Sequence, residues 1–480
     1  MAKNIVWFRN DLRINDNPAL IEAINYGTVF PIYIFDENSH NNRKLGGASK
    51  WWLHQSLKSL NKTLNDKLNI YVGDSKKILQ KLVSENNINA IFWNRNYEPY
   101  RIKQDSEIKK WLKEKNLIVK SFNGSLLWEP QKILKSDQTP YKVFTPFYRK
   151  GCLGSESPRQ PLKIPKNFDI FYDQKNSVDI RDLKLLPKVN WYKEMAEIWQ
   201  VGENFAFEKL KNFVKDSLSN YKEGRNFPAL KNVSRLSAHL HFGEISPHQI
   251  WHYIKENCQN LNNPNIDCFL SELGWREFSC YLLFHFPDLP SKNFQPRFDE
   301  FTWQKNSKFL EAWQKGQTGY PIVDAGMREL WRTGYMHNRV RMIVGSFLVK
   351  NLLIDWREGE KWFWDCLVDA DLASNSASWQ WVAGSGADAA PYFRVFNPIL
   401  QGEKFDNIGE YTKLYVPELK NIPDKFLFQP WKAPIDILKN SGIKLGVNYP
   451  KPIVDIDESR NLALETFKKL PKISKEDILQ

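Results

Sequence analysis

Residues 318–401 read TGYPIVDAGMRELWRTGYMHNRVRMIVGSFLVKNLLIDWREGEKWFWDCLVDADLASNSASWQWVAGSGADAAPYFRVFNPILQ, and this stretch decides the fold. Two acids, Asp369 and Asp371, lie beside the polar run 374–376, and arginines lie in segments otherwise apolar enough to be buried. These arginines are Arg328, Arg332, Arg339, Arg341 and Arg357. Buried charges are unfavourable unless they pair with each other or with a bound ion. The pattern therefore indicates either a helical core with internal ion pairs or a site for a large, flat, phosphate-bearing ligand.

Motifs along nearly the whole chain resemble those of the photolyase/cryptochrome family and occur in the family's order. They are IVWFRNDLRINDNPAL (5–20), RNFPAL (225–230), SRLSAHLHFGEISP (234–247), ELGWREF (272–278), GYPIVDAGMREL (319–330), GYMHNRVRM (334–342), DWREGEKWFWDCLVDADLASNSASWQW (355–381) and PYFRVFNP (391–398). By this resemblance the protein is most similar to class I cyclobutane pyrimidine dimer photolyases, which are flavoproteins that repair DNA with blue light.

The first 125 residues alternate short β-rich runs with amphipathic helical stretches. The expected strands are 5–8, 29–35, 70–72, 90–93 and 118–122, with helices at 18–25 and 51–65. Such alternation predicts a parallel sheet covered by helices on both faces. Neither GxGxxG nor GxxxxGK[ST] occurs, so no dinucleotide fingerprint or P-loop is expected. We predict an α/β domain with a Rossmann-like, five-stranded parallel sheet.

Prolines and mixed charge interrupt residues 126–190, which predicts a connector that crosses the surface. From residue 191 the periodicity is helical. We therefore expect an antenna-chromophore domain at 1–125 and an all-α FAD-binding and catalytic domain at 191–480. Ser246-Pro247 predicts a helix start, because Ser caps helices and Pro suits their first position. The main helices are expected at 248–257, 269–286, 322–333 and 338–354.

The composition is basic, with 68 Lys and Arg against 55 Asp and Glu, a net charge of +13 and a pI near 9.2. This excess suits a polyanionic partner such as nucleic acid, although it also serves solubility. Five cysteines without a CxxC pair indicate a reducing compartment. The N-terminus lacks a signal-peptide core, and no uncharged apolar run reaches about 18 residues. We expect a cytoplasmic monomer without a membrane segment.

The resemblance implies that FAD binds in a folded form inside the helical domain. The matching positions are Tyr221, Val233, Ser234, Arg235, Leu236, Ser237, Phe269, Arg276, Arg341, Asp369, Asp371 and Asn375. Hydroxyls and backbone N–H groups at residues 234–237 suit a pyrophosphate, although SRLS alone is more often a helix cap. By the resemblance, Asn375 faces flavin N5 and is catalytic. Val233 and Phe269 depart from the Thr and Trp of many close relatives.

The resemblance also implies a pocket for a flipped-out pyrimidine dimer, with a DNA-binding face around it. The positions are Arg225, Glu272, Trp275, Asn338, Arg339, Met342, Trp381 and Gln401. A damaged base is cheap to extrude, and indole rings offer flat walls on which bases stack. Glu272 is the expected catalytic hydrogen-bond partner of a pyrimidine carbonyl. Taken singly, Trp275 is equally consistent with a core residue, and Glu272 with an ion-pair partner of Arg276.

Three further catalytic positions, Trp303, Trp356 and Trp379, match a triad through which electrons reach the flavin in relatives. In a chain with 19 tryptophans, simple packing is the alternative. Asn338 and Met342 stand where (6-4) photolyases carry histidines, and DASH-type cryptochromes usually lose one or both pocket tryptophans. We therefore expect a light-dependent deoxyribodipyrimidine photo-lyase that acts on UV-damaged DNA. A cryptochrome blue-light receptor is the alternative, and a (6-4) photolyase matches less well.

The N-terminal domain of relatives holds a second, light-harvesting chromophore. The Asn-Glu pair that binds folate in one branch aligns with Tyr100-Arg101, whereas residues 97–105 with Asp36 look more like the deazaflavin-binding branch. The second chromophore, methenyltetrahydrofolate or a deazaflavin, therefore stays open. A zinc site was also weighed on the histidines His239, His241, His248 and His252. Because HExxH is missing, we expect no metal.

Overall fold

The structure is a computed structural model that describes residues 2–37, 43–258, 260, 262–389 and 393–471. It divides into two compact units, each built from separate stretches of the chain. Unit 1 comprises Met1–Ser219, Ser234–Pro287 and Val368–Asp371, and unit 2 comprises Asn220–Val233, Asp288–Leu367 and Leu372–Gln480. The domain limits drawn from the sequence, at residues 125 and 190, stay a prediction.

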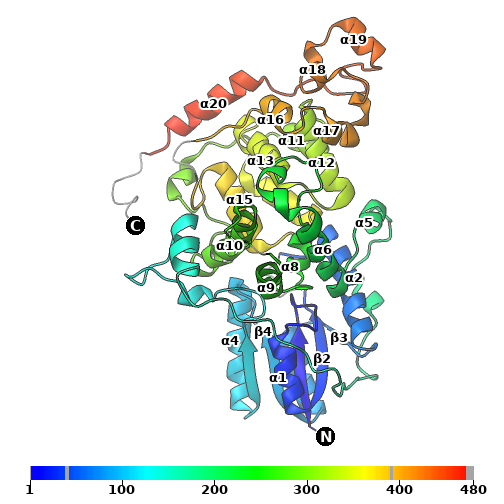
Figure 1. Cartoon of the computed structure of the whole chain (residues 1–480), viewed down its shortest axis with the longest axis vertical. Coiled ribbons are helices and arrows are strands. Elements are labelled where there is room, and N and C mark those ends of the chain that lie inside the picture. Colours follow the sequence, from blue (N-terminus) through cyan, green and yellow to red (C-terminus); the bar gives the residue numbers. More distant parts are fainter. Residues whose placement is uncertain (1, 38–42, 259, 261, 390–392, 472–480) are drawn as a thin grey trace. The chain divides into compact units, whose positions relative to one another are not determined.

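Unit 1 contains a parallel five-stranded sheet in the order β3-β2-β1-β4-β5 (Figure 1). The strands are β1 (Lys3–Phe8), β2 (Thr28–Phe35), β3 (Asn69–Val72), β4 (Ile88–Asn94) and β5 (Ile118–Phe122). In the central strand, Ile5 pairs with Phe30 of β2 and with Ile91 of β4. All three side chains are buried, as expected where helices cover both faces of a sheet. The predicted α/β fold and its five strands are confirmed.

Helices cover this sheet and continue beyond it within unit 1. They are α1 (Pro18–Tyr26), α2 (Gly47–Thr63), α3 (Ser75–Glu85), α4 (Pro99–Glu114), α5 (Lys193–Ile198), α6 (Glu203–Asp216), α8 (Ser237–His241), α9 (Pro247–Asn257) and α10 (Pro264–His285). The Ser246 hydroxyl accepts from the Gln249 backbone N–H at 2.9 Å, and the Gln249 side chain accepts from the Ser246 N–H at 2.9 Å. This capping box confirms the predicted start of α9.

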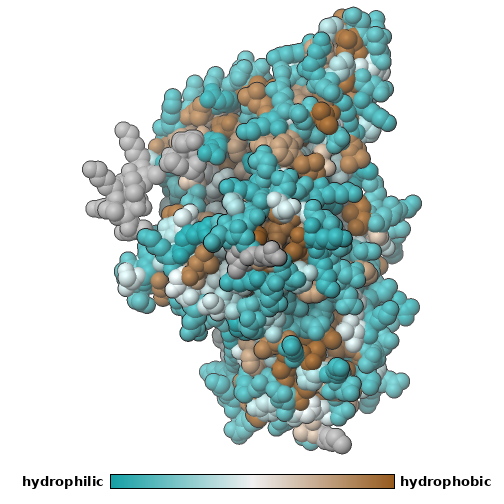
Figure 2. Space-filling view, viewed as in Figure 1, coloured by the Kyte–Doolittle hydropathy of each residue, from teal (hydrophilic) through white to brown (hydrophobic). Residues whose placement is uncertain are grey.

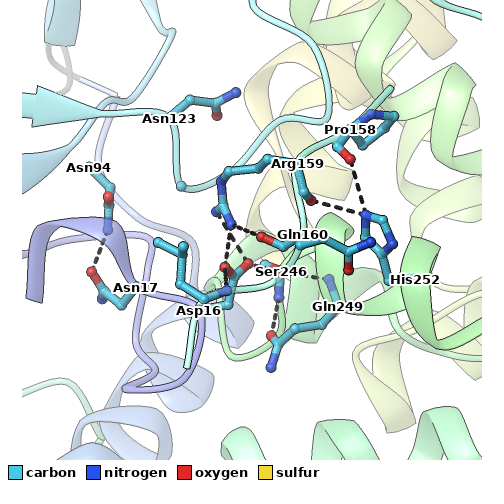
Figure 3. A network of polar contacts seen from close by, with 12 residues as sticks. Asp16, Asn17, Asn94, Asn123, Pro158, Arg159, Gln160, Ser246, Gln249 and His252 are labelled. Atoms are coloured by element: carbon cyan, nitrogen blue, oxygen red, sulfur yellow. Dashed lines mark hydrogen bonds and ion pairs between the residues drawn. The ribbon is translucent and has the colours of Figure 1, made fainter. Parts of the chain in front are cut away.

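A buried ion pair fastens the connector that follows β5 (Figure 3). Arg159 donates to the Asp16 carboxylate at 2.5 and 3.3 Å, and the Ser246 hydroxyl donates to it at 2.5 Å. The Leu162 backbone N–H adds a third donor at 2.9 Å. Burial raises the pKa of Asp16, but attraction to Arg13 and Arg159 outweighs it and keeps the pKa below its ordinary value. The loop after β1, the connector and the start of α9 therefore share one charged centre, the Asp16 clasp.

Unit 2 is helical. Its helices are α7 (Tyr221–Gly224), α11 (Ser307–Gln314), α12 (Pro321–Thr333), α13 (Asn338–Ser346), α14 (Trp356–Cys366), α15 (Leu372–Ala383), α16 (Pro398–Phe405), α17 (Glu410–Tyr415), α18 (Asp424–Leu427), α19 (Ile435–Asn440) and α20 (Ile456–Lys468). The helix predicted over 338–354 begins as α13, continues in π-helical form and ends at residue 351. A π-helical turn, Phe347–Asn351, follows α13, and the Ser346 hydroxyl just before it accepts from the Phe396 N–H at 3.2 Å.

Most of the face in Figure 2 is hydrophilic, with hydrophobic residues in separate patches. Among the helices that the structure describes, none combines the length and the apolar composition needed to span a bilayer.

A lysine is buried in the π-helical turn of unit 2. Lys350 is 4% exposed, donates to the Arg394 carbonyl oxygen at 2.7 Å and lies 4.1 Å from the centre of the Phe393 ring. Within the described ranges it has no carboxylate partner. Burial, with a smaller effect of the Arg394 charge, lowers the pKa of Lys350 to about 7. The ordinary pKa of lysine is about 10.4, so the unfolded chain binds more protons than the folded one between these values.

We predict that Lys350 makes the free energy of unfolding rise with pH from about 7 to about 10, because stability rises wherever the unfolded state binds more protons. The free energy of unfolding is measured with denaturant at pH 7 and at pH 9.5. Between these pH values it should rise more in the unaltered protein than in Lys350→Met, by on the order of 1–3 kcal/mol. An equal rise in both proteins would contradict the lowered pKa.

Candidate functional site

Helix α10 brings four predicted site residues of unit 1 close together, because positions three and four apart share a helix face. These residues are Phe269, Glu272, Trp275 and Arg276. Phe269 is buried against Phe213, with ring centres 4.6 Å apart. The Arg276 guanidinium donates to the Ser125 carbonyl oxygen at 2.8 Å. Arg276 also pairs with Glu277, at 3.3 Å.

The SRLS turn meets the two site acids in unit 1. Helix α8 begins at Ser237, as the sequence predicts, and the Ser237 hydroxyl donates to the Asp369 carboxylate at 2.6 Å. The Ser237 hydroxyl therefore positions Asp369, whereas the sequence predicted that it would bind a pyrophosphate. Asp371 lies 4.0 Å from the His241 ring nitrogen. Arg235, in the middle of the turn, has a φ of 51°, a conformation that favours glycine, which marks the turn as tightly constrained.

Several polar groups near Asp371 keep accessible surface although they are strongly desolvated. Burial raises the pKa of Glu98, Tyr100 and Cys280, and the charge of Asp371 adds to the rise at Glu98 and Cys280. The Tyr100 hydroxyl donates to the Glu98 carboxylate. Burial lowers the pKa of His241, so this imidazole is neutral. Partly accessible polar groups in a desolvated setting are available to a polar ligand and are typical of functional sites.

In unit 2, α14 fixes the orientation of the site amide. Asn375 of α15 is 8% exposed, and its Nδ2 donates to the Glu360 backbone oxygen at 3.0 Å and to Glu360 Oε1 at 2.8 Å. The Asn375 carbonyl oxygen has no hydrogen-bond donor within the described ranges. It is therefore left free to accept from a ligand. Sequence reasoning missed Glu360, which is one of two acids, with Glu358, in the aromatic run WREGEKWFW.

Two predicted DNA contacts also lie close together in unit 2. Arg339 donates to Asn226 Oδ1 at 2.5 Å and lies 4.4 Å from the Phe405 ring centre. Burial and the neighbouring Arg225 lower its pKa. Arg225 itself lies 5.4 Å from the ring centre of Tyr221, a predicted cofactor residue. Two guanidinium groups this near each other favour an anion between or beside them.

The remaining predicted residues of unit 2 lie on α13, α15 and α16. Arg341 Nε donates to the Met336 carbonyl oxygen at 2.7 Å, and Met342 Sδ accepts from Arg339 at 3.9 Å. Trp381 Nε1 donates to the Asp388 carbonyl oxygen at 3.1 Å. Asn338 is the first residue of α13, Gln401 lies on α16, and Val233 ends the short segment that follows α7.

The three predicted electron-transfer tryptophans have different neighbours. Trp379 is 3% exposed and lies between the rings of Trp313 and Phe363. Trp356 is fully buried and donates to Asn293 Oδ1 at 3.0 Å, whereas Trp303 packs on Phe301. Within the described part of the chain, none of the three has another of the three as a direct ring neighbour. The triad stays a prediction.

Two of the four histidines that could suggest a zinc site are held by protein groups in unit 1. His239 pairs with Glu244 at 2.5 Å, and His252 contacts the carbonyl oxygens of Pro158 and Arg159 at 3.1 and 3.0 Å (Figure 3). Burial lowers the pKa of His248 to about 3. Among the described residues, no group of three or more His, Cys, Asp or Glu side chains is arranged to hold a metal ion.

A separate pocket opens beside strand β2 in unit 1. It is lined by Tyr33, Ile34, Phe35, Asp36, Glu37, Leu45 and Arg101. Asp36 accepts from the Ser75 backbone N–H at 2.9 Å and from its hydroxyl at 2.8 Å. Arg101 is 7% exposed. Asp36 and Arg101, which both belong to the region considered for the second chromophore, therefore line one pocket.

Comparisons with known proteins agree with this arrangement. A model described as DNA photolyase matches residues 4–166, and one described as FAD binding domain of DNA photolyase matches residues 269–469. The chain is 48% identical to a deoxyribodipyrimidine photo-lyase of Agrobacterium fabrum, over 98% of both chains. The chain belongs to the DNA photolyase family. It is also 36% identical to Cryptochrome-2 of Arabidopsis thaliana, over 96% of this chain and 78% of that one.

A solved structure gives the same result. The crystal structure of a class III photolyase from Agrobacterium tumefaciens superposes with a TM-score of 0.92 at 47% identity, over 98% of this chain and 97% of that one. The predicted photolyase fold and FAD cofactor are confirmed. The residues present also fit a flavin nucleotide: desolvated polar groups surround Asp371, and the Asn375 carbonyl oxygen is free to accept.

We predict that Glu360→Leu shortens the dark lifetime of reduced flavin in air by about five- to tenfold, because the Asn375 amide loses the two contacts that hold its orientation and a lost hydrogen bond is worth about 1 kcal/mol. The measurement is the recovery of oxidised-flavin absorbance after photoreduction. Glu358→Gln is the control, since Glu358 lies on the same helix but pairs with exposed Lys361. Equal lifetimes in both variants would remove the role given to Glu360.

Proposed function

We propose that this photolyase-family enzyme splits cyclobutane pyrimidine dimers in UV-damaged DNA by light-driven electron transfer. The observation that supports this most is 48% identity, over 98% of its length, to an enzyme named deoxyribodipyrimidine photo-lyase. FAD, when bound, supplies the electron that opens the cyclobutane ring and takes it back afterwards. Because the electron returns, the reaction has no net redox change and the enzyme is a lyase.

The chain's own residues bind and orient the lesion. Trp275 and Trp381 stack against the extruded pyrimidines. Any base can stack in this way, because every base has a π-face. Glu272 donates a hydrogen bond to a pyrimidine carbonyl and stabilises the negative charge that develops there. Asn338 and Met342 complete the pocket in place of the histidines of (6-4) photolyases.

The cofactor is held by the predicted FAD residues. The SRLS turn supplies backbone donors for the pyrophosphate, with Asp369 and Asp371 on its border. The Asn375 carbonyl oxygen accepts from the N5 side of the flavin, because Glu360 holds the amide nitrogen. Tyr221, Val233, Phe269, Arg276 and Arg341 complete this set. Trp303, Trp356 and Trp379 pass electrons to the flavin.

DNA binds through phosphate contacts that do not depend on sequence. The DNA backbone on either side of the lesion is contacted by Arg225, Arg339 and Gln401. Such contacts fix the position of the protein on the DNA without reading the bases. The net charge of +13 strengthens the attraction to DNA at low salt. A monomer in the cytoplasm is part of this proposal.

We keep class I as the proposed class and class III as its alternative, because the solved structure at 47% identity is that of a class III photolyase. The cryptochrome alternative is kept by the 36% identity to a plant cryptochrome. We further propose that the pocket lined by Asp36 and Arg101 holds the second chromophore, a folate or a deazaflavin.

A repair assay tests the proposal. An oligonucleotide with one thymine dimer is mixed with protein that holds fully reduced flavin and is illuminated with blue light. We expect the dimer to revert to thymines only in the light, and a parallel (6-4) substrate to stay unchanged. Binding without reversal would favour the cryptochrome receptor.

A substitution tests the lesion pocket. Trp381→Ala should weaken binding of dimer-containing DNA by about 1–3 kcal/mol, the value of one base–aromatic stack. Trp331→Ala is the matched control in unit 2, because Trp331 is 57% exposed and stacks on Trp362, away from the predicted positions. Flavin content should be unchanged in both variants. Loss of flavin from Trp381→Ala would show that this residue belongs to the cofactor site.

A further inference from the structure

Part of the connector, residues 141–152, packs along α10 and lies outside every functional role assigned so far. The Tyr141 backbone N–H donates to the Tyr281 hydroxyl oxygen at 2.9 Å. Arg149 forms two parallel hydrogen bonds with Asp267, at 2.7 and 2.6 Å. These contacts lie 14 residues apart on α10 (281 − 267), so the segment follows much of the helix. Its side chains are therefore set against the face that carries Trp275.

The centre of this packing is a stack of three aromatic rings. Phe144 lies against Trp275 with ring centres 3.8 Å apart and planes 10° apart. Tyr148 also stacks on Phe144, with ring centres 5.5 Å apart and planes 10° apart. Phe278 meets both Phe144 and Trp275 edge-on, at 5.9 Å each. Phe144 and Tyr148 are 8% and 1% exposed, so two buried rings support one side of Trp275.

A glycine on α10 makes this stack possible. A Cβ atom at Gly274 would lie 2.6 Å from Tyr148 Cδ2, which is closer than real Cβ contacts. The residue next to Trp275 must therefore lack a side chain for Tyr148 to reach its place in the stack. Tyr148 lies in the π-helical turn Pro146–Cys152, and Phe144 lies four residues before Tyr148. Local backbone on both elements is thus adapted to the three rings.

The stack covers one side of Trp275, and the residue is only partly buried. Among the described residues, its only ring contacts are with Phe144 and Phe278. Its ring N–H has no acceptor in the same part of the chain, and the residue keeps accessible surface. A tryptophan that is held on one side by rings and keeps accessible surface is pre-organised to stack a flat ligand, because its rotamer freedom is already lost.

We infer that Phe144 is a positioning residue of the lesion pocket, which fixes the plane of Trp275 so that the indole meets the extruded pyrimidines. This inference rests on the proposed function. Phe144 does not contact the lesion and acts only through Trp275. The connector therefore takes part in lesion recognition in addition to joining the sheet to the helices.

The test compares Phe144→Leu with Phe147→Leu. The Phe147 ring is also buried in the same segment, but it contacts Tyr281 and Phe278 and not Trp275. Dissociation constants are measured in the dark, at one salt concentration, for dimer-containing and undamaged oligonucleotides. Phe144→Leu should weaken dimer binding about three- to tenfold and leave undamaged DNA within about twofold. Phe144→Tyr should restore dimer binding, and Phe147→Leu should keep the preference for the dimer.

Two further arms separate positioning from general packing. In a Trp275→Ala background, Phe144→Leu should change dimer affinity by less than about twofold, because non-additivity is expected of residues that act as one unit. If Phe144→Leu does not fold, Phe144→Met replaces it with the same expectation. An equal loss with and without Trp275, or for both oligonucleotides, overturns the inference. Should the unaltered protein show no preference for the dimer, the proposed function fails first, and the two failures are distinguished.

Discussion

An ionised group in a protein interior must be compensated, and unit 1 is arranged around one such group. The Asp16 side chain is 1% exposed and is neutralised by Arg159, with the Ser246 hydroxyl and a backbone N–H as further donors (Figure 3). Removing a partner from a buried pair typically costs about 3–5 kcal/mol, because an uncompensated charge remains. Three distant segments therefore have to meet at this point. The meeting places α9, and the longer α10 follows it directly in the chain.

The same principle of local support recurs at the candidate site. The Asn375 amide is held by Glu360, Asp369 by the Ser237 hydroxyl, and Trp275 by Phe144. None of the supporting groups needs to touch a ligand. Each restricts a residue that is proposed to contact the cofactor or the lesion, so that less entropy would be lost when that ligand binds.

The sequence predicted what depends on local pattern. Alternating apolar runs located all five strands, and Ser246-Pro247 located the start of α9, because periodicity and capping are properties of neighbouring residues. The family resemblance supplied the candidate site residues. Contacts between residues far apart in the chain leave no such pattern in the sequence. Phe144 and Trp275, for example, are 131 positions apart (275 − 144). Likewise, the sequence did not show that Lys350 donates to the Arg394 carbonyl oxygen. Ser237 was predicted as a donor, but its acceptor Asp369 could not be known before the chain was folded.

In the proposed reaction, an electron leaves a flavin held in this chain, opens a pyrimidine dimer and returns. A single blue flash given to the dark complex of reduced protein and dimer-containing DNA tests it most directly. Repaired dimers and the flavin spectrum are measured before and after the flash. The account predicts repaired dimers with an unchanged flavin spectrum, since the electron comes back. Oxidised flavin that accumulates while the dimers stay intact would contradict it.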